Sequence, residues 1–494
     1  MAKNKRGRLK DIGDKVCEEY LNFLPTSNST KPPHIANGLF RRCYYGQVCN
    51  LKDVHDWISG EGKNKVPSSE EIIDRYSYIF SEGKNTDEQD VKDFRFLLND
   101  IFNQDNTIYP SYDMSVYNVS SNLLIKRSVP AEAKIGEFLF DILSYQLDGR
   151  RSEMIDLINA ALKKDNDDLT RIIKPIISSC PEEGFTRITK QEQIEYKDNS
   201  DISWDETKAI IREGFDNLAK NMQASGEAKN SLLVLERVVN FSLFATFLYL
   251  VDASSIQEKV PILIDSGMEL DSIKKASEQA YIFAKKSVEK LFVNSIHNII
   301  SQEITENTAS ACEKWINETA FFEDNDLDLE AAAAVEGYFK SFCDDGINPL
   351  RALAKAIQIT LYTLIYENES PNDFCTVLGS RGGLIGPKAG HSKKRYLINS
   401  FTLETITLSV LSIDDLKEVE FKTLCDKMKR KYNILFGANP EKDYSNLEET
   451  NIAQNTPGDL RGDLSLNYQA FADVYVSLGL GKQYADGVTV ISWR

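Results

Sequence analysis

The sequence predicts a mainly α-helical protein that ends in a short β-hairpin. Apolar residues recur at i, i+3 and i+4 through most of residues 131–370, which is the spacing of an amphipathic helix. These segments share no fixed repeat length, so they indicate a helical domain rather than a solenoid of identical units. Near the C-terminus, two short runs flank Asp486-Gly487, a dipeptide that supplies the positive φ angles of a type I′ hairpin turn.

The N-terminal 130 residues have a mixed character. Residues 1–10 form a basic arm with almost no apolar residues, which is either a solvated tail or an arm that follows phosphates. Residues 11–130 form a mixed α and aromatic domain. We expect helices at 11–23 and 91–102, and a strand or extended segment at 109–119.

Residues 131–373 form the predicted helical body. Its helices share the amphipathic spacing and are expected at 131–147, 153–162, 205–222, 232–251, 271–303, 309–319, 330–342 and 348–366. The segment 232–251 is the most apolar, but Glu236 and Arg237 interrupt it. The uninterrupted part is too short to span a bilayer, so we expect a buried core helix and no membrane association.

Residues 400–494 are predicted to form a module like a winged helix-turn-helix. Helices are expected at 401–411, 418–432 and 467–478, followed by a hairpin of 482–485 and 488–492. A polar insertion, 437–462, separates the second and third helices. This order of three helices and a two-stranded ribbon is typical of winged helices.

A glycine-rich basic segment, residues 374–399, connects the body to this module. No carboxylate occurs between Phe374 and Leu403, although the net charge of the 494-residue chain is -17. Clustered cations make a local positive field, and glycines let a backbone approach a ligand closely. The segment does not fit a nucleotide-binding P-loop, which needs Gly-Lys-Ser/Thr. We expect a loop that binds nucleic acid; the alternatives are a plain connector and a docking site for an acidic protein.

The candidate nucleic-acid contacts are cations of this segment, of the second helix and of the hairpin, with Tyr396 available to stack on a base. They are Arg381, Lys388, Lys393, Lys394, Arg395, Tyr396, Lys427, Lys429, Arg430, Lys431 and Lys482. The third helix differs because it contains Asp473 and no cation, which is unsuited to reading DNA. Its face is predicted to bind a partner protein through Phe471, Asp473, Val474 and Val476.

Composition and motifs predict a non-catalytic cytoplasmic protein without a cofactor. The start of the chain lacks the apolar stretch of a secretory signal, and none of the eight cysteines forms a CxxC pair. The weak metal candidate is His34, Cys43, Cys49 and His55, whose spacing is unfavourable for structural zinc. No HExxH motif or recognisable carboxylate cluster is present.

The C-terminal third resembles accessory subunits of bacterial multi-gene DNA-restriction and anti-phage defence systems. The resemblance is carried by residues 378–384 (LGSRGGL), 393–396 (KKRY), 478–480 (LGL) and 485–488 (ADGV). Among such subunits, it resembles the middle subunit of phosphorothioation-dependent restriction systems. The resemblance implies an antiviral role in a bacterial complex, beside a motor ATPase.

The expected function is therefore that of a non-catalytic subunit which links a nucleic acid to partner proteins such as an ATPase, helicase or nuclease. One alternative is a protein-interaction scaffold without nucleic-acid contact. A lower-ranked alternative is an enzyme whose site the sequence does not reveal.

Overall fold

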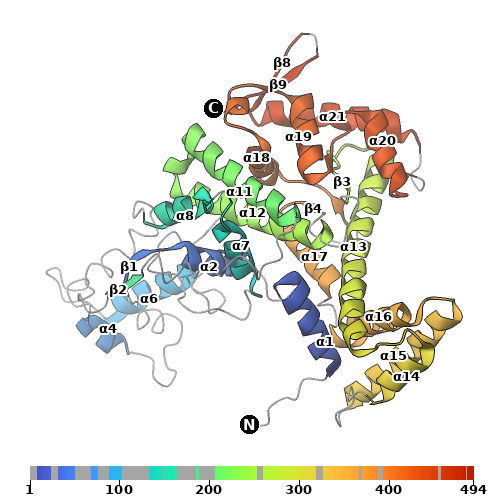
Figure 1. Ribbon diagram of the computed structural model, residues 1–494. Coiled ribbons are helices and arrows are strands. Elements are labelled where there is room, and N and C mark those ends of the chain that lie inside the picture. Colours follow the sequence, from blue (N-terminus) through green and yellow to red (C-terminus); the bar gives the residue numbers. More distant parts are fainter. Residues whose placement is uncertain are drawn as a thin grey trace. The chain divides into compact units, whose positions relative to one another are not determined.

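Helices dominate the computed structural model, accounting for 73% of the described residues against 6% for strands. The prediction of a mainly α protein is therefore confirmed (Figure 1). The structure describes residues 8–23, 32–49, 68–75, 88–102, 133–147, 149–163, 185–188, 206–252, 260–318, 326–366, 370–387, 393–453, 458–485 and 487–493. Some of the predicted features lie outside these ranges. They are the expected strand at 109–119, most of the basic arm, and the residues Lys388, His55 and Asp486.

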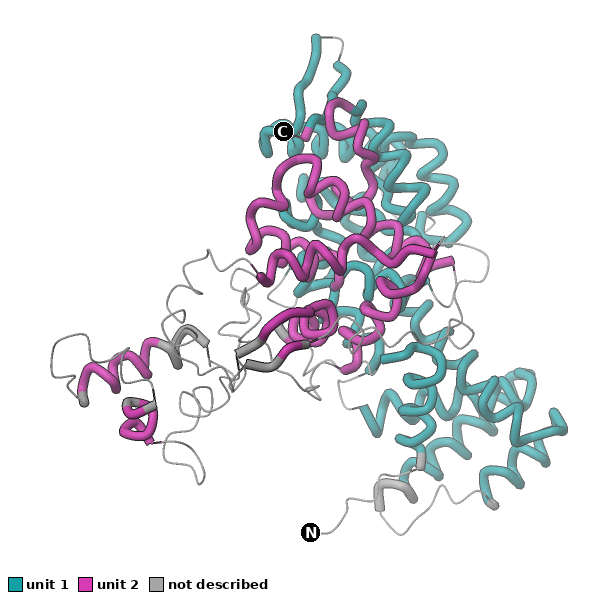
Figure 2. The backbone as a smooth tube through the Cα atoms, turned by 60° about the vertical axis from the view of Figure 1, so that its left-hand side comes forward, with its two compact units in different colours: residues 1–30, 243–403, 419–492 teal, residues 31–242, 404–418, 493–494 magenta. Residues whose placement is uncertain are grey.

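The chain forms two compact units, and neither is a continuous stretch of sequence (Figure 2). Unit 1 comprises residues 1–30, 243–403 and 419–492. Unit 2 comprises residues 31–242, 404–418 and 493–494. The five linear domains expected from the sequence stay a prediction.

Unit 2 is built mainly of helices from the first half of the chain. Its elements are α2 (Pro32–Cys43), β1 (Gly46–Cys49), α4 (Ser69–Arg75), α6 (Glu88–Phe102), α7 (Ile135–Ser144), α8 (Glu153–Lys163), β2 (Phe185–Ile188) and α11 (Glu206–Ser225), with most of α18 (Ser400–Val410). Helices α2 and α7 approach each other closely at Gly38 and Gly136. A side chain at Gly136 would collide with the backbone of Gly38, so this crossing requires glycine. The antiparallel pair β1 and β2 completes this part.

Helix α12 (Ser231–Asp252) is apolar on all sides, with residues 231–242 in unit 2 and the rest in unit 1. Among the described helices it is the one long and apolar enough to cross a membrane, but 83% of its apolar window is buried inside the protein. A helix that is hydrophobic all round belongs in the interior of a large protein or in a bilayer. The burial agrees with the core helix predicted from the sequence.

Unit 1 is organised along α13 (Asp271–Glu303), the longest described helix. Further elements are α1 (Arg8–Val16), α14 (Ala309–Glu318), α15 (Asp326–Asp344), α16 (Pro349–Thr360), α17 (Pro371–Arg381), β4 (Ile385–Gly386) and β5 (Arg395–Tyr396). Single π-helical turns follow α1 and α16, at Cys17–Leu21 and Leu361–Ile365. Because α1 begins at Arg8 and Leu9 is buried, residues 8–10 are helical rather than part of a solvated arm.

The C-terminal part of unit 1 combines three helices with two small sheets. Its elements are β6 (Val419–Glu420), α19 (Phe421–Tyr432), β7 (Ile434–Leu435), α20 (Pro440–Glu449), α21 (Leu460–Ser477), β8 (Gly481–Gln483) and β9 (Thr489–Ile491). One sheet is antiparallel with strand order β6-β9-β8. In the other, β7 pairs in parallel with β3 (Ile262–Leu263), which precedes α13 in the chain.

The helices expected in the body are found, and α13 has the predicted bounds. No helix was predicted where α2, α4, α17 and α20 lie. Helix α20 lies within 437–462, the predicted polar insertion. Asn439 caps its first turn and Pro440 begins it, a combination that favours a helix start.

Candidate functional site

The basic segment is ordered at both ends rather than a free loop. Ser370 caps the N-terminus of helix α17, and its hydroxyl accepts a hydrogen bond from Asp373 N in a capping box. After the turn at Gly382 and Gly383, β4 pairs with β5 in antiparallel register. Arg395 lies in β5, and Lys393 and Lys394 directly precede this strand.

The glycines of this segment have structural roles. A side chain at Gly379 would collide with Ile385, and one at Gly383 would collide with Asn399. Gly383 also has φ +73°, a conformation that favours glycine. Both glycines are buried, so close packing, rather than the approach of a ligand, accounts for them.

Carboxylates from elsewhere in unit 1 neutralise much of the segment's charge. Arg395 Nε lies 2.6 Å from Asp265 Oδ2, and Asp265 is only 1% exposed. Lys393 Nζ lies 3.5 Å from Glu278 Oε1 on α13. Lys394 donates a hydrogen bond to the carbonyl of Pro387. The missing carboxylates are thus supplied by residues more than a hundred positions away in the sequence.

Tyr396 is a core residue. Its side chain is fully buried, with T-shaped ring contacts to Phe247 and Tyr281. Its N–H donates to Ser277 Oγ at 3.0 Å, and burial raises the pKa of its hydroxyl well above the usual value. The expected stacking on a base is not available to a ring in this position.

The cations of α19 are also partly used within the protein. Lys429 Nζ lies 2.6 Å from the buried carboxylate of Asp443, and the Lys431 ammonium lies 5.7 Å from the centre of the Tyr432 ring. Among the predicted nucleic-acid contacts that the structure describes, Lys393, Arg430 and Lys482 are exposed. Those that are half-buried are Arg381, Lys394, Arg395, Lys427, Lys429 and Lys431.

Helix α21 presents a different kind of surface. Leu466, Gln469, Asp473 and Val476 are exposed and fall on one stripe, since they are spaced by three and four residues. Leu466 and Val476 are exposed by 44% and 40%. Of the predicted partner contacts, Asp473 and Val476 lie on this stripe, whereas Val474 is half-buried and Phe471 packs in the core against Phe436.

The hairpin continues this surface. The position of a Cβ on Gly481 would be 2.9 Å from Val476 N, so β8 starts against the end of α21. Tyr484 at the tip is 44% exposed, and the Lys482 ammonium lies 5.0 Å from the centre of its ring. We call Leu466, Gln469, Asp473, Val476, Lys482 and Tyr484 the α21–hairpin surface.

The hairpin turn lies one residue earlier than predicted. The N–H of Gly487 donates to the carbonyl of Tyr484, and the N–H of Tyr484 donates to the carbonyl of Val488. Gly487, with φ +83°, is therefore the fourth residue of the turn rather than one of its two central residues. The ribbon and the positive φ of Gly487 agree with the prediction, but the type I′ turn does not.

A buried asparagine anchors α21 to the parallel strand pair. The Nδ2 group of Asn467 donates to the carbonyls of Ile264 and Phe436, at 2.9 and 3.1 Å. Its Oδ1 accepts from the N–H of Ser266 at 2.9 Å. The core beneath the α21–hairpin surface therefore includes residues that precede α13, so the C-terminal segment by itself lacks one of its strands.

The described members of the weak metal candidate do not form a site. His34 and Cys43 are buried in the same helix, α2. Nine residues of α-helix separate them by about 13 Å along the axis, too far for one zinc ion. In the part of the chain that the structure describes, no group of three His, Cys, Asp or Glu is arranged to hold a metal.

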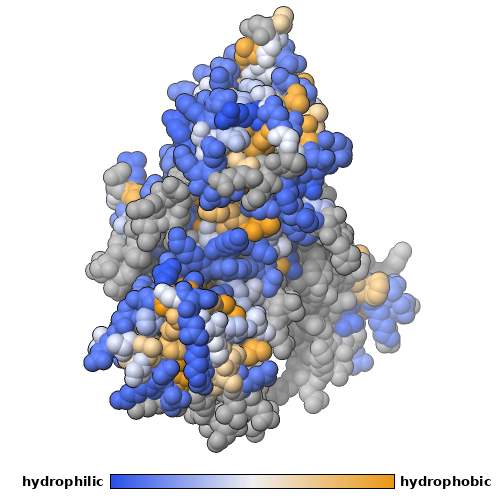
Figure 3. Space-filling model, turned by 90° about the vertical axis from the view of Figure 1, so that its right-hand side faces the viewer, coloured by the Kyte–Doolittle hydropathy of each residue, from blue (hydrophilic) through white to orange (hydrophobic). Residues whose placement is uncertain are grey.

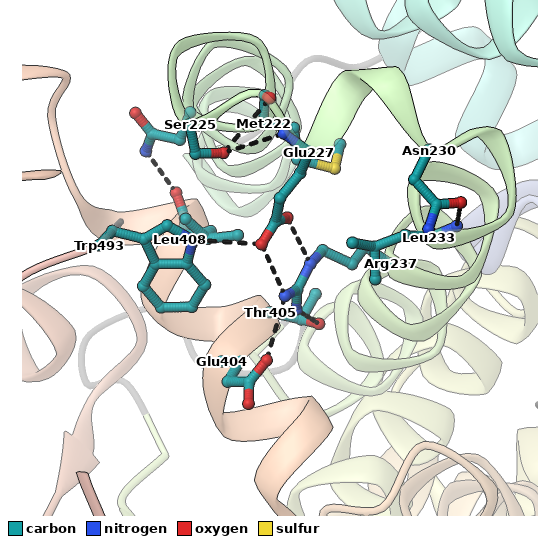
Figure 4. A network of polar contacts seen from close by, with 11 residues as sticks. Met222, Ser225, Glu227, Asn230, Leu233, Arg237, Glu404, Thr405, Leu408 and Trp493 are labelled. Atoms are coloured by element: carbon teal, nitrogen blue, oxygen red, sulfur yellow. Dashed lines mark hydrogen bonds and ion pairs between the residues drawn. The ribbon is translucent and has the colours of Figure 1, made fainter. Parts of the chain in front are cut away.

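A buried ion network in unit 2 was not anticipated (Figure 4). Arg237 on α12 makes two hydrogen bonds to the Glu227 carboxylate, at 2.8 and 3.0 Å, and one to Glu404 at 3.1 Å. It also donates to Thr405 Oγ1 at 3.2 Å. The indole N–H of Trp493 donates to Glu227 at 3.2 Å. Because Arg237 is only 2% exposed, this network ties three segments of the unit together but offers little surface to a ligand.

No protein-family model, curated protein or solved structure matches this chain. The resemblance to subunits of defence systems therefore stays a prediction from the motifs alone.

Proposed function

We propose that this chain is a non-catalytic subunit that binds a partner protein through the α21–hairpin surface. The observation that carries the proposal is the exposed stripe of α21, which has apolar residues at both ends and Asp473 between them. Removing the apolar side chains of this stripe from water is favourable in free energy, and the carboxylate would repel phosphates. Both properties suit a protein better than a nucleic acid.

The order of elements supports assigning a winged-helix role to this part of the chain. The strand order β6-β9-β8, with α19 and α21 preceding the hairpin, is that expected of a winged helix-turn-helix. In this assignment α21 has the position of the recognition helix. Helices that read DNA bases present Arg, Lys, Asn or Gln, and of these the α21 stripe has only Gln469.

The exposed surface is otherwise unremarkable in composition. The face in Figure 3 is mainly hydrophilic, with apolar residues in small groups. Exposed apolar residues scattered singly are normal. The apolar residues of the α21–hairpin surface stand out by their alignment rather than by their number.

A second candidate function, contact with a nucleic acid, is favoured by the exposed cations Lys393, Arg430 and Lys482. In this proposal the chain links DNA to an ATPase or nuclease, as the resemblance implies. Changing Lys393 to Ala tests this proposal, because the substitution removes an exposed cation and leaves the Arg395–Asp265 pair in place. If Lys393 contacts a phosphate, the salt dependence of binding to a DNA duplex becomes shallower by about one unit. An unchanged salt dependence would remove Lys393 from any interface.

The experiment for the main proposal compares two exposed apolar positions on α21 with one elsewhere. The double variant Leu466→Ala, Val476→Ala should lose its partner on affinity purification from the cells that naturally produce the protein. The matched control is Ile413→Ala, which removes a side chain of 53% exposure outside this surface. Deleting the C-terminal segment is a poor test because it would leave β3 without its partner strand. Retention of every co-purifying protein by the double variant would contradict the proposal.

A further inference from the structure

The exposed stripe of α21 has the spacing of a helix-packing seam. Its members are Gly462, Leu466, Gln469, Asp473 and Val476, which are separated by four, three, four and three residues. This alternation is the a/d spacing by which two helices pack side by side, and Leu466 and Val476 are its apolar side chains. From Leu466 to Val476 the seam is about 15 Å long, or roughly three helical turns.

The rest of α21 is already used within unit 1. Leu464, Phe471 and Tyr475 on the opposite side are buried. Arg461, at the start of the helix, lies against Tyr444 with its guanidinium 4.2 Å from the ring centre, and its Nε is 3.6 Å from Glu441. Its charge is therefore directed to α20 and away from the seam.

The seam contains one charged residue, Asp473, which lies between Gln469 and Val476. Asp473 is exposed and makes no ion pair or hydrogen bond with another side chain in the described part of the chain. The nearest exposed cation of the surface, Lys482, lies over the ring of Tyr484. A partner with a cation opposite Asp473 would therefore complement the seam, and one with a carboxylate there would be repelled.

We propose that the partner element is an amphipathic helix whose apolar residues meet Leu466 and Val476 and whose Lys or Arg meets Asp473. This inference rests on the proposed function, since it specifies what docks on the same surface. A helix laid along a partner helix is recognised by anchors at i, i+3, i+4 and i+7, which the seam matches.

An added β-strand fits this surface less well. Strand β8 has three residues, and the end of α21 covers it at Gly481. The hydrogen bond from Ser492 N to Leu480 O and that from Tyr484 N to Val488 O direct alternate backbone groups of β8 towards β9. Of the three residues of β8, Gln483 has backbone N–H and C=O groups that face away from β9 and are not covered by α21. One such residue offers too few hydrogen bonds for a stable pair with an added strand.

The first experiment places a photo-reactive amino acid at Gln469 in the full chain, in the cells that naturally produce it. The control position is Ser445, which is exposed on α20 and outside the seam. We expect position 469, and not 445, to crosslink to a helical segment of another protein with Lys or Arg among heptad-spaced apolar residues. A crosslink to a strand or loop of a protein would overturn the helix and leave protein docking intact. No protein crosslink at 469 would overturn both proposals.

The second experiment reverses the central charge with purified full-length proteins. Asp473→Lys should weaken binding of the crosslinked partner about tenfold or more, and Asp473→Asn should weaken it less. Changing the partner's facing Lys or Arg to Glu should restore binding to the Asp473→Lys variant. Equal affinities of all combinations would show that no cation faces Asp473.

Discussion

The basic segment 374–399 and helix α21 both stand out by their charge, but the structure uses the two charges in opposite ways. Arg395 in the basic segment is paired with the buried carboxylate of Asp265. Asp473 on α21 is exposed and has no ionic partner among the described residues. The sign and density of charge in a sequence window therefore do not show whether a partner must come from outside, because the protein's own neutralising groups come from distant positions.

The largest expected effect is on the inward-facing pair. Arg395→Ala leaves Asp265 buried without its cation, so the free energy of unfolding should fall by about 3–5 kcal/mol. Urea denaturation followed by circular dichroism measures this loss. Lys393→Ala is the matched control, because the Lys393 side chain is 72% exposed and Glu278 keeps a second ion pair with Lys275, so the loss should be about 1 kcal/mol or less. Equal stability of the two variants would show that Arg395 does not neutralise a buried charge.

The network around Arg237 offers a weaker test of inward-facing charge. Trp493→Phe keeps a ring near Arg237, whose guanidinium carbon lies 5.6 Å from the indole ring centre, but removes the hydrogen bond to Glu227. The free energy of unfolding should fall by about 1 kcal/mol. Thermal denaturation measures the change. A loss as large as that of Arg395→Ala would mean that the indole has a larger role in packing than its hydrogen bond indicates.

A half-buried carboxyl group predicts a dependence on pH. Burial raises the pKa of Glu236 to about 7, although neighbouring Arg237 acts in the opposite direction. The folded protein then holds this proton more tightly than the unfolded chain, whose value is 4.5. This contribution to stability is complete below about pH 4.5 and is lost as the pH rises to about 7. Glu236→Gln should flatten the decline of Tm between these values; an unchanged slope would assign the decline to other groups.

The smallest effect on stability is expected for the outward-facing charge. Asp473→Asn removes an exposed carboxylate with no ionic partner among the described residues, so the free energy of unfolding should change by less than about 0.5 kcal/mol. Urea denaturation of the purified chain provides the measurement. A large loss of stability would show that Asp473 is held by the protein itself, which would remove the contrast with Arg395.

The helical elements show how far local sequence determines this fold. Helix α13 is predicted with its observed bounds because 33 residues keep one apolar face, and periodicity over many turns is a strong local signal. Helix α17 is not predicted because Gly379 lies within it and more glycines follow at once, a composition that is typical of a loop. Strands β3 and β7 have two residues each and pair across more than 160 positions, so no local pattern announces them.

In the candidate site, too, some features follow from local sequence and others from tertiary contacts. The sequence by itself determined the class of fold, the absence of cations from residues 467–478, and the ribbon near Gly487, since these depend on residues close together in the chain. Only the tertiary structure decided that Tyr396 is buried, that Arg395 is neutralised by Asp265, and that Asn467 joins α21 to the strand before α13. The physical reason is that burial and charge pairing are set by neighbours in space, and folding brings those neighbours from positions that a sequence window does not contain.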